Sequence, residues 1–215
     1  MQVNSRQKAR ERAARIAEMR AVQQRKERRQ RLLIVGAVAV VCLGLITAVA
    51  VPLIGESRRQ AKLEEAASAP IDGVEESADL SANHVTGAVD YPMIPPAGGD
   101  HDAVWQNCGV YTEPVRNENA VHSLEHGAVW ITYSPDLGTD QVEALTARAE
   151  GEDYVLVSPY DGLDSPIALS AWGLQLQVKD AEDPRVDAFL TKYLQGEQTP
   201  EPGAPCFGGA GTPAA

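Results

Sequence analysis

The hydrophobic and polar positions of the chain fall into five stretches of different texture. Residues 1–31 are polar and are rich in Ala, Arg, Glu and Gln, which favour a helix. Residues 32–55 form an apolar run without a charge, and residues 56–87 are acidic with few large apolar side chains. Residues 88–197 contain short segments in which apolar residues recur at regular spacing, and residues 198–215 form a Pro/Gly-rich tail. The pattern predicts a basic helical arm, a spanning helix, a stalk, a folded domain and an extended tail.

The periodicity within residues 88–197 predicts the elements of the folded domain. Apolar, β-rich or alternating runs predict strands, and apolar positions at helical spacing between a capping residue and a glycine predict helices. The predicted strands are 128–134, 154–160 and 166–179, and the predicted helices are 139–150 and 183–196. This β-α-β-β-α order predicts a small α/β domain with a mixed sheet and flanking helices, and it fits a thioredoxin-like connectivity.

The apolar run at residues 32–55 is long enough for a transmembrane helix. About 20 helical residues cross a hydrocarbon core, whereas a buried core helix rarely runs this long without a charge. A cleaved signal peptide fits less well, because about thirty residues of basic arm precede the run and no A-x-A-like site follows it. The sequence therefore predicts a single-pass protein of the cell membrane.

Charge predicts the orientation of that helix. Residues 1–32 carry eleven Lys/Arg and three Asp/Glu, whereas the remainder carries eight and twenty-seven. Basic segments stay on the cytoplasmic side, so the N-terminus is predicted in the cytoplasm and the acidic domain outside it. We expect the arm to rest on anionic lipid headgroups and not on nucleic acid.

The cysteines fit an oxidising compartment. Cys42 lies in the apolar run, where a thiol packs as a small apolar group. Cys108 and Cys206 lie outside the span and are predicted to pair across about 98 residues. The alternative is that both thiols are copper ligands. Without a C-x-x-C motif, a thioredoxin-type redox role has no support.

The stretch "HSLEHG" holds two of the four histidines of the chain. His122, Glu125 and His126 match H-x-x-E-H, the inverted zinc-protease motif. We do not expect a protease, because Gly127 and an apolar run follow at once. The candidate for the third zinc ligand, Glu201, also sits between two prolines in the tail.

A metal site without proteolysis is a better interpretation of the same residues. If 119–126 is helical, His122 and His126 share a face, and His101 can fold over them. Three imidazoles outside the cell suit copper or zinc. The candidate ligands are His101, His122, His126, Glu125 and Met93, with Cys108 as a further possible fourth ligand. His84, in the stalk, is assigned no role.

Two other interpretations of the histidines stay open. They can form a structural network around a tight loop, with Glu125 fixing a tautomer and with Arg116 and Glu118 taking part. The histidines can also serve together with Glu125 in acid–base catalysis. Ser123 is not a convincing nucleophile, because neighbours in a helix do not face each other.

Several motifs together resemble a known family. "YPMIPPAGGDH", "GVYTEPV", "ENAVHSLEHGAVWITY", "VSPYDGL" and "IALSAWG" are similar to an uncharacterised bacterial membrane-anchored family, the domain of unknown function 3105. The resemblance covers about residues 88–200, and "VHSLEHG" is its specific part. Ala97 and Gly98-Gly99 stand where the family often has Ser-Gly, so no hydroxyl role is expected there. The resemblance points to the same histidines and implies no activity.

Two hypotheses of function follow. The first is a membrane-anchored extracytoplasmic accessory or binding protein, docking on a respiratory or other membrane complex and binding copper or zinc through the histidines. The second is a small metal-dependent or His/Glu acid–base enzyme. An enzyme requires an open cleft at the histidines, whereas a structural network is closed with each ring nitrogen bonded.

Overall fold

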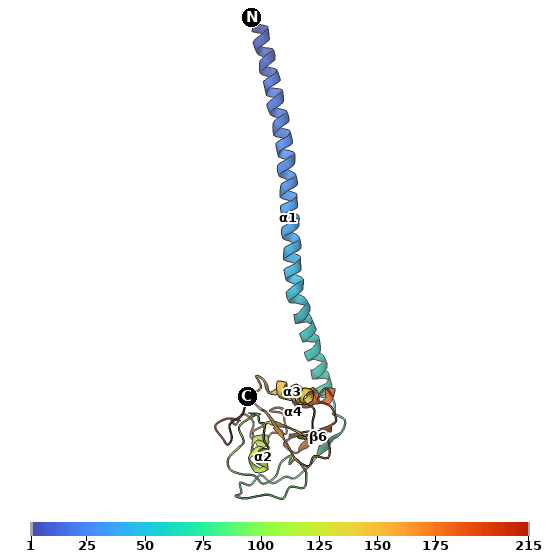
Figure 1. Ribbon diagram of the computed structural model, residues 1–215, viewed down its shortest axis with the longest axis vertical. Coiled ribbons are helices and arrows are strands. Elements are labelled where there is room, and N and C mark those ends of the chain that lie inside the picture. Colours follow the sequence, from blue (N-terminus) through green and yellow to red (C-terminus); the bar gives the residue numbers. More distant parts are fainter. Residues whose placement is uncertain (1, 215) are drawn as a thin grey trace. The chain divides into compact units, whose positions relative to one another are not determined.

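The computed structural model describes residues 2–214, which divide near residue 59 into two compact units. The first unit is helical. Helix α1 (Gln2–Ser68) is continuous through the basic arm, the apolar run and the start of the predicted stalk, as Figure 1 shows in blue to teal. The absence of glycine and proline from residues 5–31 allows the arm to join the apolar run without a break.

The large apolar side chains of the run at residues 32–54 in α1 are exposed, as far as the structure describes them. Large apolar residues from Leu32 to Ile54 are at least half exposed. Within the described residues, α1 holds the single stretch that is long and apolar enough to cross a membrane, Glu18–Ile46, which overlaps the predicted span 32–55. An uninterrupted apolar surface of this size needs a lipid or protein cover.

The second unit, from residue 60 on, is built on one mixed sheet, and we call it the sheet domain. The sheet order is β1-β6-β5-β3-β4-β2. Strand β4 is parallel to β2 and β3, while β3/β5, β5/β6 and β6/β1 are antiparallel. The strands are β1 (Val74–Glu76), β2 (Gly109–Val110), β3 (Val129–Tyr133), β4 (Val155–Pro159), β5 (Ile167–Ala171) and β6 (Leu174–Val178).

Helices cover both faces of this sheet (Figure 1). On one face, α3 (Thr139–Thr146), the short 3-10 helix η1 (Ala147–Ala149) and α4 (Pro184–Tyr193) cover an apolar core that includes Ile131 and Phe189. On the other face, α2 (Asn117–Glu125) packs through Ala120 and Leu124 on Trp130 and Leu156. Neighbouring residues of a strand point to opposite faces, so β3 serves both layers.

Local sequence explains where the predicted helices begin. The side chain of Asp183 accepts a hydrogen bond of 2.9 Å from the backbone N–H of Arg185, and Pro184 takes the first helical position of α4, as predicted. Helix α3 begins at Thr139 after Gly138. The predicted α/β class with a mixed sheet and flanking helices is confirmed.

The segment 166–179 is not one strand, as we expected, but the hairpin of β5 and β6. The chain turns at Trp172 and Gly173, and Gly173 has φ +72°. The apolar alternation runs through the turn without a polar gap, which hides it from a pattern argument. The hairpin is covered by the Pro-rich loop, because Gln175 Nε2 donates to Pro95 O at 2.7 Å.

The end of the predicted stalk also differs from a free linker. Ile71 is buried in the apolar core, and β1 forms the edge of the sheet by pairing with β6. Residues 84 and 101 form an isolated parallel bridge. Residues 71–85 are therefore part of the sheet domain, although their few apolar side chains gave no periodic signal.

The tail lies along the sheet domain and is held by a disulfide. The Sγ atoms of Cys108 and Cys206 are at bonding distance, 1.95 Å, so neither sulfur is a free thiolate for copper. Backbone hydrogen bonds support the same contact, including Cys108 N to Cys206 O and Asn107 N to Ala210 O, both 2.8 Å. The tail is thus fixed beside the end of α2.

Candidate metal centre

Helix α2 carries most of the polar groups of the candidate centre. It runs from Asn117 to Glu125, and His126 is its C-terminal cap. His122 and Glu125 are three residues apart and His122 and His126 are four apart, which places them on one side of the helix. Gly127 then turns the chain at φ +95°, where a Cβ would collide with the side chain of Gln195. A glycine is therefore required at the end of the motif.

His101 reaches the centre from the glycine-rich loop. Gly98 and Gly99 have φ of +144° and +116°, which residues other than glycine rarely adopt. The loop turns at these two residues, just before His101. The N–H of His101 donates to Asn83 O at 3.0 Å, and the N–H of Val85 donates to His101 O at 2.8 Å. This pairing brings the segment around residue 84 beside His101.

The three buried histidines share one arrangement of their Nδ1 atoms. Each Nδ1 lies at hydrogen-bond distance from a backbone carbonyl. A carbonyl only accepts, so Nδ1 carries the hydrogen and Nε2 of the neutral ring keeps a lone pair. The distances are 2.8 Å for His101 to Gly99 O, 2.6 Å for His122 to Asp102 O and 2.8 Å for His126 to Pro205 O.

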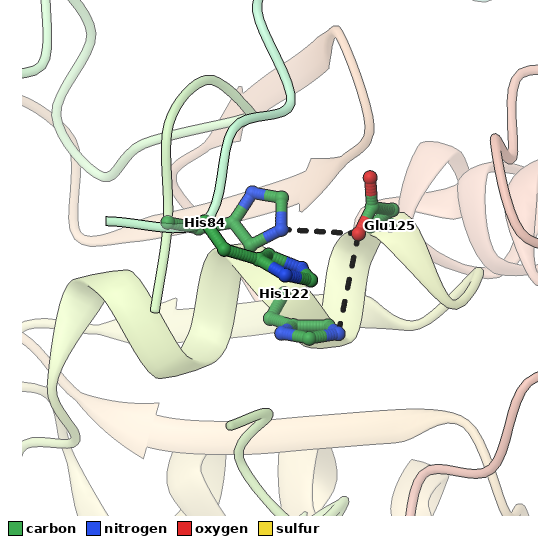
Figure 2. Close-up of side chains that lie close together, drawn as sticks. His84, His122 and Glu125 are labelled. Atoms are coloured by element: carbon green, nitrogen blue, oxygen red, sulfur yellow. Dashed lines mark ion pairs between the residues drawn. The ribbon is translucent and has the colours of Figure 1, made fainter. Parts of the chain in front are cut away.

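The Nε2 atoms face other acceptors. His101 Nε2 lies 3.0 Å from Glu125 Oε2, and neither of these buried atoms has another hydrogen-bond partner among the described residues. His122 Nε2 lies 4.0 Å from the same oxygen and 2.9 Å from His126 Nε2. Figure 2 shows the Glu125 carboxylate turned toward His122. Facing lone pairs repel each other unless a cation or a proton lies between them.

His84 completes this group. The ligand atoms of His84, His101, His122 and Glu125 all lie within 4.8 Å of one another. The His84 ring stacks on that of His122, with centroids 5.0 Å apart and an angle of 23° (Figure 2). His84 is the exposed member of the group, while the other three are buried. The sequence gives one indication that His84 belongs to this group: the chain has only four histidines.

The remaining predicted ligands lie in different places. His126 is next to the group through its contact with His122. Met93 lines a small cavity with Leu80, Tyr91 and Ala97. Glu201, which we had set aside because it lies in the tail, has Oε2 3.7 Å from His126 Nε2. The structure thus brings together His101, His122, Glu125 and His126 and adds His84 and Glu201.

Comparison with known proteins identifies a family. Residues 84–208, more than half of the chain, match the family model described as "Protein of unknown function (DUF3105)". The chain belongs to this family. No curated protein and no solved structure matches the chain. The matched DUF3105 region begins at His84 and contains all four histidines, Glu125, Glu201 and the disulfide.

Burial sets the protonation of His122 in the DUF3105 histidine cluster. The pKa of His122 is lowered from 6.5 to about 4, first because burial disfavours the charged ring and then because His126, His101 and His84 would repel a further positive charge. The carbonyl of Asp102 opposes this shift. His122 is therefore neutral at pH 7, as a metal-binding imidazole must be.

A polar layer behind the cluster fixes His122. Arg116 Nη1 contacts Asp102 Oδ2 at 2.7 Å, and Arg116 Nε contacts Glu118 Oε2 at 2.9 Å. The pKa of Asp102 is lowered, first by the backbone N–H of Val104 and then by Arg116. Since Asp102 O holds His122 Nδ1, Arg116 positions the ring indirectly. Such partners orient metal-binding histidines.

The surroundings of the cluster admit an ion more readily than a large substrate. His101, His122 and His126 are 0–4 % exposed. The ring of Trp105 packs on His122 and His126, with centroids 5.7 and 5.0 Å apart. A neighbouring cavity of about 400 Å³ is lined by other residues, including Gln106, Tyr111 and Arg116. Chemically, the arrangement can hold a transition-metal ion.

Proposed function

We propose that this DUF3105 protein is a membrane-anchored accessory or binding protein whose sheet domain binds zinc or copper. The observation that carries the proposal is the contact between His101 Nε2 and Glu125 Oε2, two buried atoms 3.0 Å apart that make no hydrogen bond to any other described group. A bound cation would turn this repulsion into coordination. Imidazole and carboxylate groups are common ligands of zinc and of divalent copper.

The Nδ1 contacts support metal binding over a purely structural network. In such a network each imidazole nitrogen finds a partner of the opposite kind. Here all three Nδ1 atoms are satisfied by carbonyls, while the Nε2 atoms face acceptors or one another. Metal-binding histidines commonly have this division of roles.

The oxidised sulfurs narrow the choice of metal. Thiolates favour monovalent copper, but Cys108 and Cys206 are bonded to each other. Nitrogen and oxygen donors remain, which favours Zn²⁺ or Cu²⁺. The burial of the rings favours a binding role over the alternative of a metal-dependent or acid–base enzyme, because a substrate needs an open cleft.

We also propose that the N-terminus lies in the cytoplasm, that α1 crosses the cell membrane and that the sheet domain lies outside. The excess of Lys and Arg before the apolar run supports this orientation. The disulfide is consistent with an oxidising compartment. In this position the sheet domain can dock on a larger membrane complex, respiratory or other, as an accessory protein.

We further propose a thioredoxin-like connectivity for β3-α3-β4-β5-β6-α4. The proposal is supported by the order β6-β5-β3-β4, in which β3 and β4 are parallel and the hairpin β5/β6 adjoins β3 in antiparallel pairing. A crystal structure compared with solved thioredoxin-like domains would test it.

Elemental analysis of the full chain in detergent, purified without a metal-affinity tag, tests the metal proposal. After exposure to Zn²⁺ or Cu²⁺ and removal of excess metal, we expect at least one ion per chain. His101→Gln and Glu125→Gln should each remove about one ion. The control is Glu113→Gln, which changes an exposed carboxylate in the neighbouring loop. A folded wild-type protein that retains neither metal would contradict the proposal.

A further inference from the structure

The cluster contains more metal-binding side chains than one ion can use. Zinc in proteins is almost always four-coordinate, whereas six candidate ligands lie in a continuous group: His84, His101, His122, Glu125, His126 and Glu201. Successive contacts from His101 through Glu125, His122 and His126 to Glu201 measure 3.0, 4.0, 2.9 and 3.7 Å. The last two residues lie outside the compact group of four.

His126 is positioned as a ligand in the same way as His101 and His122. Its ring is buried, its Nδ1 contacts Pro205 O at 2.8 Å, and its Nε2 faces His122 Nε2 at 2.9 Å. Two lone pairs at this distance require a cation or a proton between them. This is a second unfavourable contact, separate from that of His101 with Glu125.

Glu201 is held beside His126 by the backbone. Its N–H donates to Glu125 O at 3.1 Å, and the disulfide at Cys206 fixes the tail a few residues later. The carboxylate is 59 % exposed, while the His126 side chain is 4 % exposed. Glu201 therefore covers the cluster at its solvent side and supplies an anionic oxygen there.

We propose that the cluster is a two-metal centre, with His84, His101 and Glu125 at one ion and His122, His126 and Glu201 at the other. Glu125 lies between the two sets, since its Oε2 contacts His101 and approaches His122. A carboxylate in that place can bridge two ions, which lie about 3.5–4 Å apart in two-metal sites. This inference rests on the metal-binding function proposed above.

Each set combines at least one buried imidazole with one exposed side chain. His84 is exposed at the first set and Glu201 at the second, so each ion has a side open to water. Three protein ligands leave a further coordination position for water or for a small anion. The ligand chemistry, imidazole and carboxylate without thiolate, assigns Zn²⁺ or Cu²⁺ to both positions.

Native mass spectrometry of the full chain in detergent counts the ions directly. With Zn²⁺ or Cu²⁺ in excess, we expect two ions per wild-type chain and one in Glu201→Gln and in His126→Gln. Glu197→Gln is the matched control, since it changes another exposed carboxylate, directly before the tail. The exposure of Glu201 means that Glu201→Gln should preserve the fold, so a lost ion would not reflect unfolding.

Electron paramagnetic resonance of the Cu²⁺-loaded protein gives a second readout. Two ions a few ångströms apart should broaden or suppress the isolated Cu²⁺ spectrum, and Glu201→Gln should restore the spectrum of a single ion. One ion per wild-type chain, unaffected by Glu201→Gln and His126→Gln, would overturn the two-metal centre and leave the metal-binding function intact. A folded wild-type chain without any ion would remove both.

Discussion

Helices α2 and α4 pack on opposite faces of one sheet, and they bury different kinds of side chain. The buried residues of α4 are Val186, Ala188, Phe189 and Leu190, all apolar. Those of α2 include five polar residues among eight: Glu118, Asn119, His122, Ser123 and Glu125. Both helices are short, nine and ten residues, and each packs on central strands.

The difference indicates which helix serves stability and which serves function. Burial of apolar surface stabilises a fold, whereas a buried polar group costs free energy unless it is hydrogen-bonded. On α2, Ser123 and Asn119 are satisfied by carbonyl oxygens at 2.6 and 2.5 Å, but Glu125 Oε2 has only the 3.0 Å contact with His101 Nε2, and neither atom has a hydrogen-bond partner elsewhere among the described residues. Polar groups left in this state are better explained by ligand binding than by stability.

The largest expected effect is on the α4 face. Phe189 is fully buried, and Phe189→Ala should lower the free energy of unfolding by about 3–5 kcal/mol through lost burial and a cavity. Denaturant unfolding measures the change. Phe207→Ala is the control, because this side chain is 74 % exposed. Metal content per folded chain should stay at the wild-type value, and a loss of metal would show that the two faces are coupled.

On the α2 face we expect a smaller change in stability, together with a loss of metal affinity. Arg116→Met removes the contacts with Asp102 and Glu118 that fix the carbonyl at His122. We expect metal affinity to fall about tenfold, in the range seen for outer-shell partners. The unfolding free energy should change by about 1 kcal/mol or less, since the guanidinium is partly exposed.

Competition with a chelator of known affinity measures that change. Arg148→Met is the matched control, because Arg148 forms a similar 2.7 Å contact with Asp187 on the α3/α4 side. Equal metal affinities of the two variants would refute a positioning role for Arg116.

The last expected effect is the pH dependence of the metal-free protein. The pKa of His122 is about 4 in the folded chain and near 6.5 when unfolded, so between these values the unfolded chain binds more protons. Stability should therefore be full above about pH 6.5 and should decrease as the pH falls toward 4. The rings of His84, His101 and His126 and the carboxylate of Glu125 also face this ring.

Denaturant unfolding of chelator-treated full chain at several pH values tests this dependence. His122→Gln should flatten the profile between pH 6.5 and 4, whereas Phe189→Ala should lower the whole profile without changing its slope. An unchanged slope in His122→Gln would assign the pH dependence to other groups.

Much of the fold could be predicted because its elements carry local signals. The strand at 129–133 and the capped start of α4 follow from short patterns around Tyr133 and Asp183, and the disulfide follows from the presence of two cysteines outside the apolar run. The turn at Gly173 was missed because apolar residues alternate on both sides of it. The edge strand β1 was missed because three residues give no periodicity.

The candidate site was predicted only in part, for a related reason. His122, Glu125 and His126 lie in one motif, so helical spacing places them together. His84 and Glu201 join them through single long-range contacts, a bridge between residues 84 and 101 and a backbone hydrogen bond to Glu125. The polar residues around His84 and Glu201 form no sequence pattern that indicates such a contact.

The disulfide between Cys108 and Cys206 joins a segment next to α2 to the tail, which is synthesised last. Helix α2 is synthesised well before the segment with Glu201 and Pro205, which supplies the last contacts of His126. A nascent chain that ends before Glu201 has the HSLEHG motif without these contacts. The His126 side of the proposed centre is therefore completed only after the tail has been synthesised and has folded back on α2, and a metal supplied earlier would meet an incomplete set of ligands.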